Sequence, residues 1–67
     1  MTNFHLLPNG GRWTLTTDSG ERYFADIDGD DRALFHALEI AKERSGALLI
    51  HREDGTIAEQ RSFGQRF

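Results

Sequence analysis

The sequence predicts a small α+β domain, a two-layer sandwich with the element order β-β-β-α-β-β and a mostly antiparallel sheet. The chain has 67 residues, which is room for one domain over residues 1–67 and for no linker. Short segments in which apolar and polar residues alternate lie on both sides of a single segment with helical periodicity. One helix covers only one face of a sheet, so the second face is expected to stay open.

The first 25 residues are predicted to form three antiparallel strands. An apolar run stops at Pro8 and the glycine pair that follows, which are strong turn signals. The next segment alternates polar and apolar residues, with Trp13 and Leu15 facing the core. The predicted strands are residues 4–7, 12–17 and 21–25, with turns at residues 8–11 and 18–20.

The helix is predicted from Asp30 to Ser45. An aspartate at the N-cap would accept backbone N–H bonds, and acidic residues in the first turn interact favourably with the helix dipole. Gly46 is the expected C′ residue that ends the helix. The apolar stripe that would face the sheet consists of Leu34, Ala37, Leu38 and Ala41.

Two further strands are predicted after the helix. Residues 47–52 are apolar, and Asp54-Gly55 is a strong hairpin signal that favours a type I′ turn. Residues 57–61 would return as the last strand. Residues 62–67 would form a tail, containing Phe63 and Phe67, that packs back on the sheet.

The face without a helix is expected to carry apolar side chains. Successive residues of a strand point to opposite faces, so Leu6 and Leu7 cannot both face the helix, and the same holds within residues 47–50. Two alternatives would cover this face. Either Phe63 and Phe67 fold back over it, or a second chain does.

Four motifs occur in order along the chain. They are His5-Leu6-Leu7-Pro8, Gly11-Arg12-Trp13, the alanines Ala33, Ala37 and Ala41, and the segment from Leu48 to Ile57. Together they resemble the bacterial family known as domain of unknown function 2188. The resemblance extends from about Phe4 to Gly64 and implies a bacterial or phage origin, a compact β-β-β-α-β-β domain and no particular activity. Arg12 departs from the family pattern, which joins glycine directly to tryptophan, and predicts a slip or bulge at the first hairpin.

Composition excludes several classes of protein. The net charge of −3 and the pI near 5.4 do not provide the strongly basic field of a typical phosphate-binding protein. There is no cysteine, so neither a disulfide nor a thiolate zinc site can form. The longest apolar run is far shorter than the roughly 20 residues of a membrane span. We expect a cytoplasmic protein with no cofactor and no membrane partner.

Candidate chemistry is sparse, and we expect no enzyme. A histidine beside a carboxylate, as in His51 and Asp54, is typical of an acid–base pair, but Asp54-Gly55 is better explained as a turn. A metal site using His5, His51 and an aspartate would require the two histidine strands to be neighbours on one face. We therefore expect no metal site. The aspartates at 26, 28 and 30 imitate a calcium loop but lack its glycine and glutamate, which favours a helix start.

The function predicted from the sequence is that of a small non-enzymatic binding or accessory domain. It would act through the open sheet face, either in protein–protein interaction or as a homodimer. The alternative is a nucleic-acid-binding module that uses arginines on or beside the strands. The candidate residues are His5, Leu7, Leu49 and His51 for the open face, and Arg12, Arg22, Arg52 and Arg61 for nucleic acid.

Overall fold

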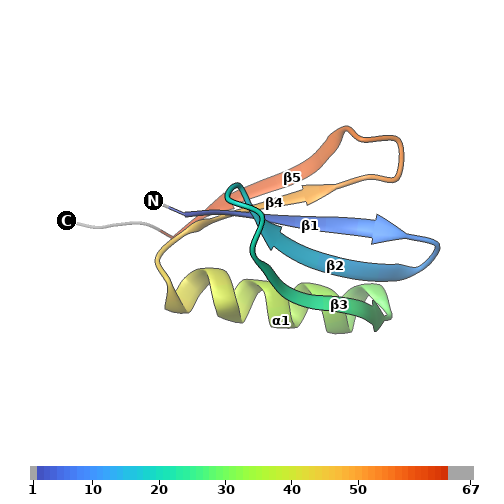
Figure 1. Ribbon diagram of the computed structural model, residues 1–67, viewed down its shortest axis with the longest axis horizontal. Coiled ribbons are helices and arrows are strands. Elements are labelled where there is room, and N and C mark those ends of the chain that lie inside the picture. Colours follow the sequence, from blue (N-terminus) through green and yellow to red (C-terminus); the bar gives the residue numbers. More distant parts are fainter. Residues whose placement is uncertain (1, 64–67) are drawn as a thin grey trace.

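The computed structural model describes residues 2–63, except the side chain of Asp26, and shows one helix packed on one face of a five-stranded sheet (Figure 1). The α+β class and the order β-β-β-α-β-β are confirmed. The elements are β1 (Asn3–Asn9), β2 (Arg12–Thr17), β3 (Arg22–Asp28), α1 (Asp30–Glu43), β4 (Ala47–His51) and β5 (Ile57–Ser62).

The sheet has the spatial order β3-β2-β1-β4-β5. β1 and β4 pair in parallel at the centre, and the other three pairs are antiparallel. α1 connects β3 to β4 and packs across β1 to β4, while β5 forms one edge of the sheet (Figure 1). The part of the chain that the structure describes contains no helix long and apolar enough to cross a membrane.

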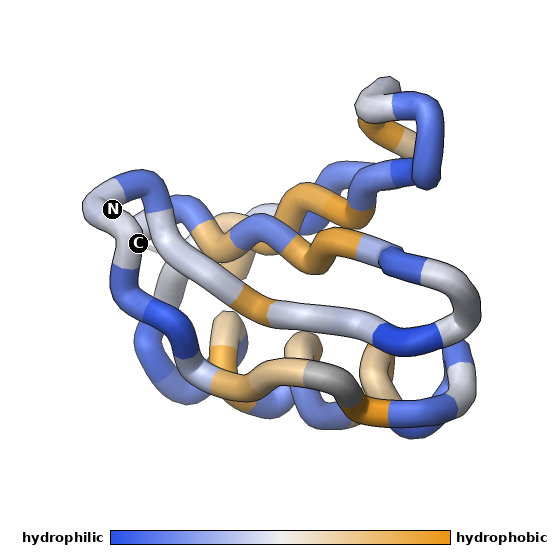
Figure 2. The backbone as a smooth tube through the Cα atoms, turned by 45° about the vertical axis from the view of Figure 1, so that its right-hand side comes forward, coloured by the Kyte–Doolittle hydropathy of each residue, from blue (hydrophilic) through white to orange (hydrophobic). Residues whose placement is uncertain are grey.

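The core lies between α1 and the sheet. Its largest fully buried side chains are Phe4, Leu6, Leu15 and Leu48, and alternation along the strands brings them to the helix side. Figure 2 shows hydrophobic and hydrophilic stretches interspersed along the backbone of the strands and the helix. α1 contributes three fully buried alanines, whose small side chains let the helix lie close to the sheet. Trp13 packs against this cluster, as predicted, together with the other half-buried residues Tyr23, Phe24, Ile27, Leu34, Leu38, Ile40, Ile50 and Phe63.

The helix begins at Asp30, as predicted, but both of its caps differ from the prediction. The N-cap is Gly29, which has no side chain to cap the helix, and Asp30 in the first turn accepts a bond from the Trp13 indole (2.9 Å). The last helical residue is Glu43, and the C′ residue is Ser45, with φ of 54°. Gly46 follows one position later, and its N–H donates to the Ala41 carbonyl (2.9 Å), as in a Schellman motif.

Both glycine hairpins differ from what the sequence predicted. Gly10 and Gly11 both have positive φ, which is the type I′ geometry, and the β1–β2 register runs unbroken to Asn9 and Arg12. The slip predicted there is wrong, since the register shifts in that part of the sheet lie between β2 and β3, on either side of Leu15. At the second hairpin Gly55 has positive φ and Asp54 does not, so that turn is not type I′.

Asp54 stabilises the second hairpin as a hydrogen-bond acceptor. Its Oδ1 accepts bonds from the Thr56 backbone N–H (2.9 Å) and hydroxyl (2.7 Å), and these bonds lower the pKa of the Asp54 carboxyl below 3.8. A carboxyl with a lowered folded-state pKa contributes stability above its unfolded-state pKa. That contribution is lost as the pH falls from 3.8 through the lower folded-state value.

Asp54→Asn is therefore expected to flatten the dependence of the melting temperature on pH below pH 3.8, where the stability contributed by the ionised Asp54 is lost. Asparagine retains an acceptor for the turn but does not titrate, so the folded state should survive at neutral pH. Thermal melts of both proteins across this range check the prediction. Equal slopes in the two proteins would contradict it.

The C-terminal segment takes a different path from the predicted tail. Ser62 is the last residue of β5 and pairs with Ala47. Phe63 donates its backbone N–H to the Gly46 carbonyl (2.9 Å) and packs against the core on the helix side. Phe63 is thus a core residue and not a cover for the open face. The prediction for Phe67 lies outside the described residues.

Candidate functional site

The sheet face opposite α1, here called the open face, brings all four predicted binding residues together. His5 and Leu7 come from β1, and Leu49 and His51 come from β4. β1 and β4 are adjacent parallel strands with His5 opposite Leu49, so these side chains point to the same side. Ile57, which pairs with His51, extends the apolar surface onto β5.

The two central strands of the open face carry apolar side chains and histidines but no charged side chain. β1 and β4 contain no Asp, Glu, Lys or Arg, although 28% of the chain is charged. Leu7 remains 37% exposed and Ile57 remains 46% exposed. A sheet that exposes such side chains at its centre resembles the core of a protein interface more than an ordinary solvated surface.

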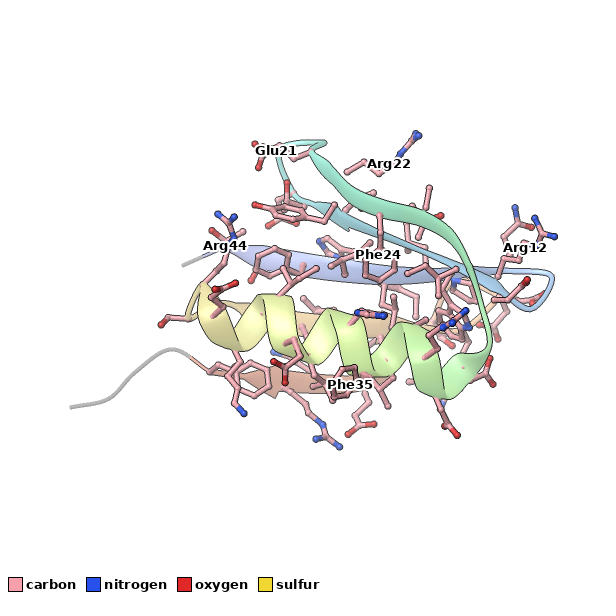
Figure 3. The ribbon with its side chains drawn as sticks, turned by 90° about the horizontal axis from the view of Figure 1, so that it is seen from below. Arg12, Glu21, Arg22, Phe24, Phe35 and Arg44 are labelled. Atoms are coloured by element: carbon pink, nitrogen blue, oxygen red, sulfur yellow. The ribbon has the colours of Figure 1, made fainter. Side chains whose placement is uncertain are left out.

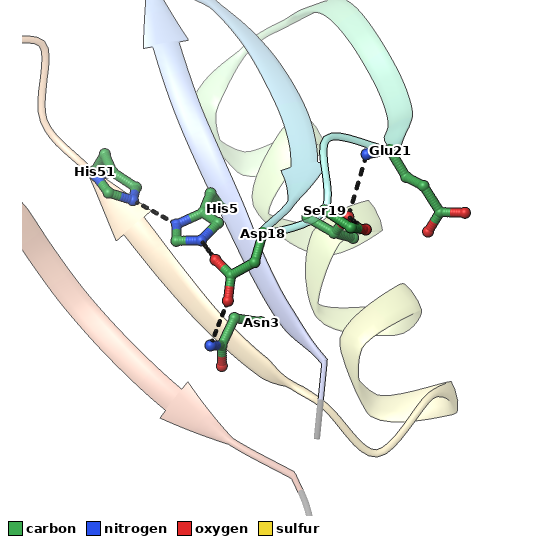
Figure 4. A network of polar contacts seen from close by, with 7 residues as sticks. Asn3, His5, Asp18, Ser19, Glu21 and His51 are labelled. Atoms are coloured by element: carbon green, nitrogen blue, oxygen red, sulfur yellow. Dashed lines mark hydrogen bonds and ion pairs between the residues drawn. The ribbon is translucent and has the colours of Figure 1, made fainter.

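A chain of polar contacts crosses the open face from β2 to β4 (Figure 4). The Asn3 amide donates to Oδ2 of Asp18 (2.7 Å), and Oδ1 of Asp18 bonds Nε2 of His5. Nδ1 of His5 then lies 3.0 Å from Nε2 of His51, with the ring centroids 5.2 Å apart. The condition for bringing the two histidines together, neighbouring strands and a common face, is met.

The Asp18 carboxylate orients the His5 ring. Two hydrogen bonds lower the pKa of the Asp18 carboxyl, and the bond from His5 has a larger effect than the bond from Asn3. These contacts therefore favour the ionised acid. An ionised carboxylate only accepts, and therefore Nε2 of His5 carries the proton between them. In the neutral ring, Nδ1 of His5 then presents its lone pair toward His51.

These contacts provide proton acceptors and ligands but hold no nucleophile. The hydroxyls of Thr17 and Ser19, next to Asp18, bond each other (3.0 Å), and Thr17 also accepts from the Glu21 backbone. Asp18 itself was assigned to a turn in the sequence. A two-residue loop at Gly10 and Gly11 sets the register of β1 and β2, so that Phe4 lies opposite Thr17. Extending this register by one residue places Asn3 opposite Asp18. Counting residues outward from the loop could therefore have predicted the contact between Asp18 and β1.

The four arginines proposed for nucleic acid are not gathered into one patch. Arg22 begins β3 at one edge of the sheet, while Arg61 lies on β5 at the other edge. Figure 3 shows Arg12 at the right-hand end of the molecule and Arg22 apart from it, along the upper side. Three of the four also have partners nearby: Arg12 pairs with Asp28 (3.2 Å), Arg61 with Glu59 (2.6 Å), and Arg52 bonds Thr56 and the Ile57 carbonyl.

A groove that the sequence did not indicate lies beside the second hairpin. Its volume is about 340 Å³, and its lining includes Trp13, Asp30, Ile50 and His51. The Trp13 indole donates to Asp30 across its floor, so the ring's polar atom is already satisfied. The groove is open to solvent, and its charged lining residues are Asp30, Arg52 and Glu53.

Comparison with known proteins gives one match. A family model described as an uncharacterized protein conserved in bacteria matches residues 4–63. No curated protein and no solved structure matches the chain.

Proposed function

The chain belongs to this uncharacterised bacterial family, DUF2188, and we propose that it is a small non-enzymatic binding domain that forms a homodimer through its open face. The observation that carries the proposal is the uncharged centre of that face, where Leu7, Leu49 and Ile57 surround a pair of histidines. α1 covers the opposite face of the sheet, so this is the sheet surface free to receive a partner.

Composition favours a protein partner over nucleic acid. Depletion of charged residues is the signature of an interface core, whereas phosphate binding needs clustered lysine and arginine. β1 and β4 lack such residues, and the charge in contact with them is the Asp18 carboxylate, which bonds Asn3 and His5. A polyanion gains nothing from this surface.

A second copy is the occupant that suits a neutral surface of this kind. In a two-fold dimer the same patch meets itself, so the uncharged side chains of β1 and β4 meet their own copies. The footprint is small, since four strands spaced about 4.8 Å apart and about 17 Å long cover roughly 300 Å². Standard interfaces bury about 800 Å² on each partner, so a concentration-dependent dimer is expected.

The proposal predicts a mass near twice 7.6 kDa at high protein concentration. Light scattering over a range of protein and salt concentrations checks it. Apolar contacts hold or strengthen as salt rises, so the dimer should resist salt. Leu7→Asp should raise the dimer dissociation constant at least about ten-fold, because it would bury a carboxylate at the interface.

Phe35→Asp is the matched control. Phe35 is 61% exposed on α1, outside the open face, so the same change there should leave the dimer intact. A monomer at every concentration would overturn the homodimer. Binding to nucleic acid that weakens steeply with salt would favour the arginine hypothesis instead.

A further inference from the structure

We propose that His5 and His51 are half of a metal site, which the same two residues of a second copy complete to hold one zinc-like divalent cation on the dimer axis. The inference rests on the proposed homodimer and deepens it, because it identifies what fastens the two open faces together. The ligands would be Nδ1 of His5 and Nε2 of His51 from each copy.

The first argument is the orientation of the lone pairs. The Asp18 carboxylate takes the proton on Nε2 of His5, which leaves Nδ1 of the neutral ring as a free donor of electrons. Nδ1 points at Nε2 of His51, so two imidazole nitrogens converge on one place (Figure 4). Without a metal, Nε2 of His51 carries a proton and donates a hydrogen bond to Nδ1 of His5. With a metal, that proton moves to the other His51 nitrogen through solvent and the ring stays neutral.

The distance between the nitrogens suits a shared ion. Zinc–nitrogen bonds of about 2.0–2.1 Å at a tetrahedral angle place two nitrogens about 3.3 Å apart. The two nitrogens are 3.0 Å apart in the structure. The two nitrogens need to move apart by only a few tenths of an ångström to reach the tetrahedral value, which half-buried side chains on adjacent strands can do.

Asp18 supplies the partner that metal-bound histidines usually have. A ligating imidazole commonly donates its second N–H to a carboxylate, which fixes its tautomer and raises its basicity. Asp18 makes that contact with His5, and Asn3 holds the other carboxylate oxygen (2.7 Å). A hydrogen bond between two histidines alone would not require this arrangement. Asp18 would act as a positioning residue and not as a ligand.

A second copy is needed because one chain is short of ligands. Structural zinc sites use four protein ligands. Within the part of the chain that the structure describes, no group of three histidine, cysteine or acidic side chains could hold a metal ion. Two-fold symmetry doubles His5 and His51 to four nitrogens. It also adds bonding energy to an interface whose apolar footprint is small.

The test is a titration of the metal-free full chain with Zn²⁺, in which sedimentation velocity measures dimer formation. A parallel series contains an excess of chelator in place of Zn²⁺. We expect Zn²⁺ to lower the dimer dissociation constant at least about a hundred-fold, with one metal bound per two chains. Cobalt(II) should bind the same site and give the visible absorption of a tetrahedral four-nitrogen ion. This absorption reports the ligand set independently of the mass.

His5→Gln and His51→Gln should each abolish the metal effect. His36→Gln is the matched control, because His36 is an exposed histidine on α1, away from the open face. Asp18→Asn should weaken Zn²⁺ binding about 10- to 100-fold while leaving the position of the cobalt band unchanged, since it alters a positioning contact and not a ligand.

The outcomes separate this inference from the proposed function. A dimer that is equally stable in Zn²⁺ and in chelator would overturn the metal site and leave the homodimer standing. A monomer under both conditions would overturn both. One metal per chain, association beyond the dimer, or loss of the effect in His36→Gln would also overturn the shared site.

Discussion

Phe4→Ala is expected to remove most of the free energy of unfolding of this domain. Phe4 is fully buried at the centre of the core and packs edge-to-face on Tyr23, with 5.3 Å between the ring centroids. Removing a buried phenylalanine costs about 3–5 kcal/mol, from lost transfer free energy and the cavity left behind. A domain of this size has a free energy of unfolding of only a few kcal/mol, so the substitution consumes most of it.

Urea unfolding followed by circular dichroism measures this effect. Phe35→Ala is the matched control, because Phe35 is largely exposed on α1 and its truncation should change the free energy of unfolding by less than about 0.5 kcal/mol. Similar losses for the two substitutions would show that Phe4 is not the centre of the core.

Gly46→Ala is expected to destabilise the domain by about 1–3 kcal/mol, the usual cost of overpacking. A Cβ atom at Gly46 would lie 2.6 Å from the Thr2 carbonyl oxygen and 2.7 Å from Cε2 of Phe4. The backbone at Gly46 cannot easily shift away from Phe4, because both of its polar groups are hydrogen-bonded. The N–H of Gly46 donates to the Ala41 carbonyl, and its carbonyl accepts from Phe63, each at 2.9 Å.

Ser45→Gly is the informative comparison for Gly46→Ala. Ser45 has φ of 54°, a left-handed conformation that costs a non-glycine residue about 1–2 kcal/mol. Glycine at position 45 should therefore raise the free energy of unfolding. Because glycine also increases the conformational entropy of the unfolded chain, the smallest expected effect is no change. The same urea series checks both proteins. A neutral Gly46→Ala would contradict the close approach to Phe4.

Local patterns were sufficient for the architecture. Alternation along the strands placed Leu15 and Leu48 on the helix side and Leu7 and Leu49 on the other, because the side-chain period of a strand is two. Helical spacing placed Ala37 and Ala41 on the buried face of α1. The candidate residues of the open face follow from the same alternation.

What the sequence by itself determined about this protein is its class, the order of its elements and the composition of its two sheet faces, since each depends on residues a few positions apart. The tertiary structure decided the contacts between distant segments. His5 meets His51 because β4 pairs with β1, and Asp30 becomes an acceptor for Trp13 instead of capping the helix. Gly46 is a glycine because Phe4 arrives beside it from 42 positions earlier, a contact that no local pattern encodes.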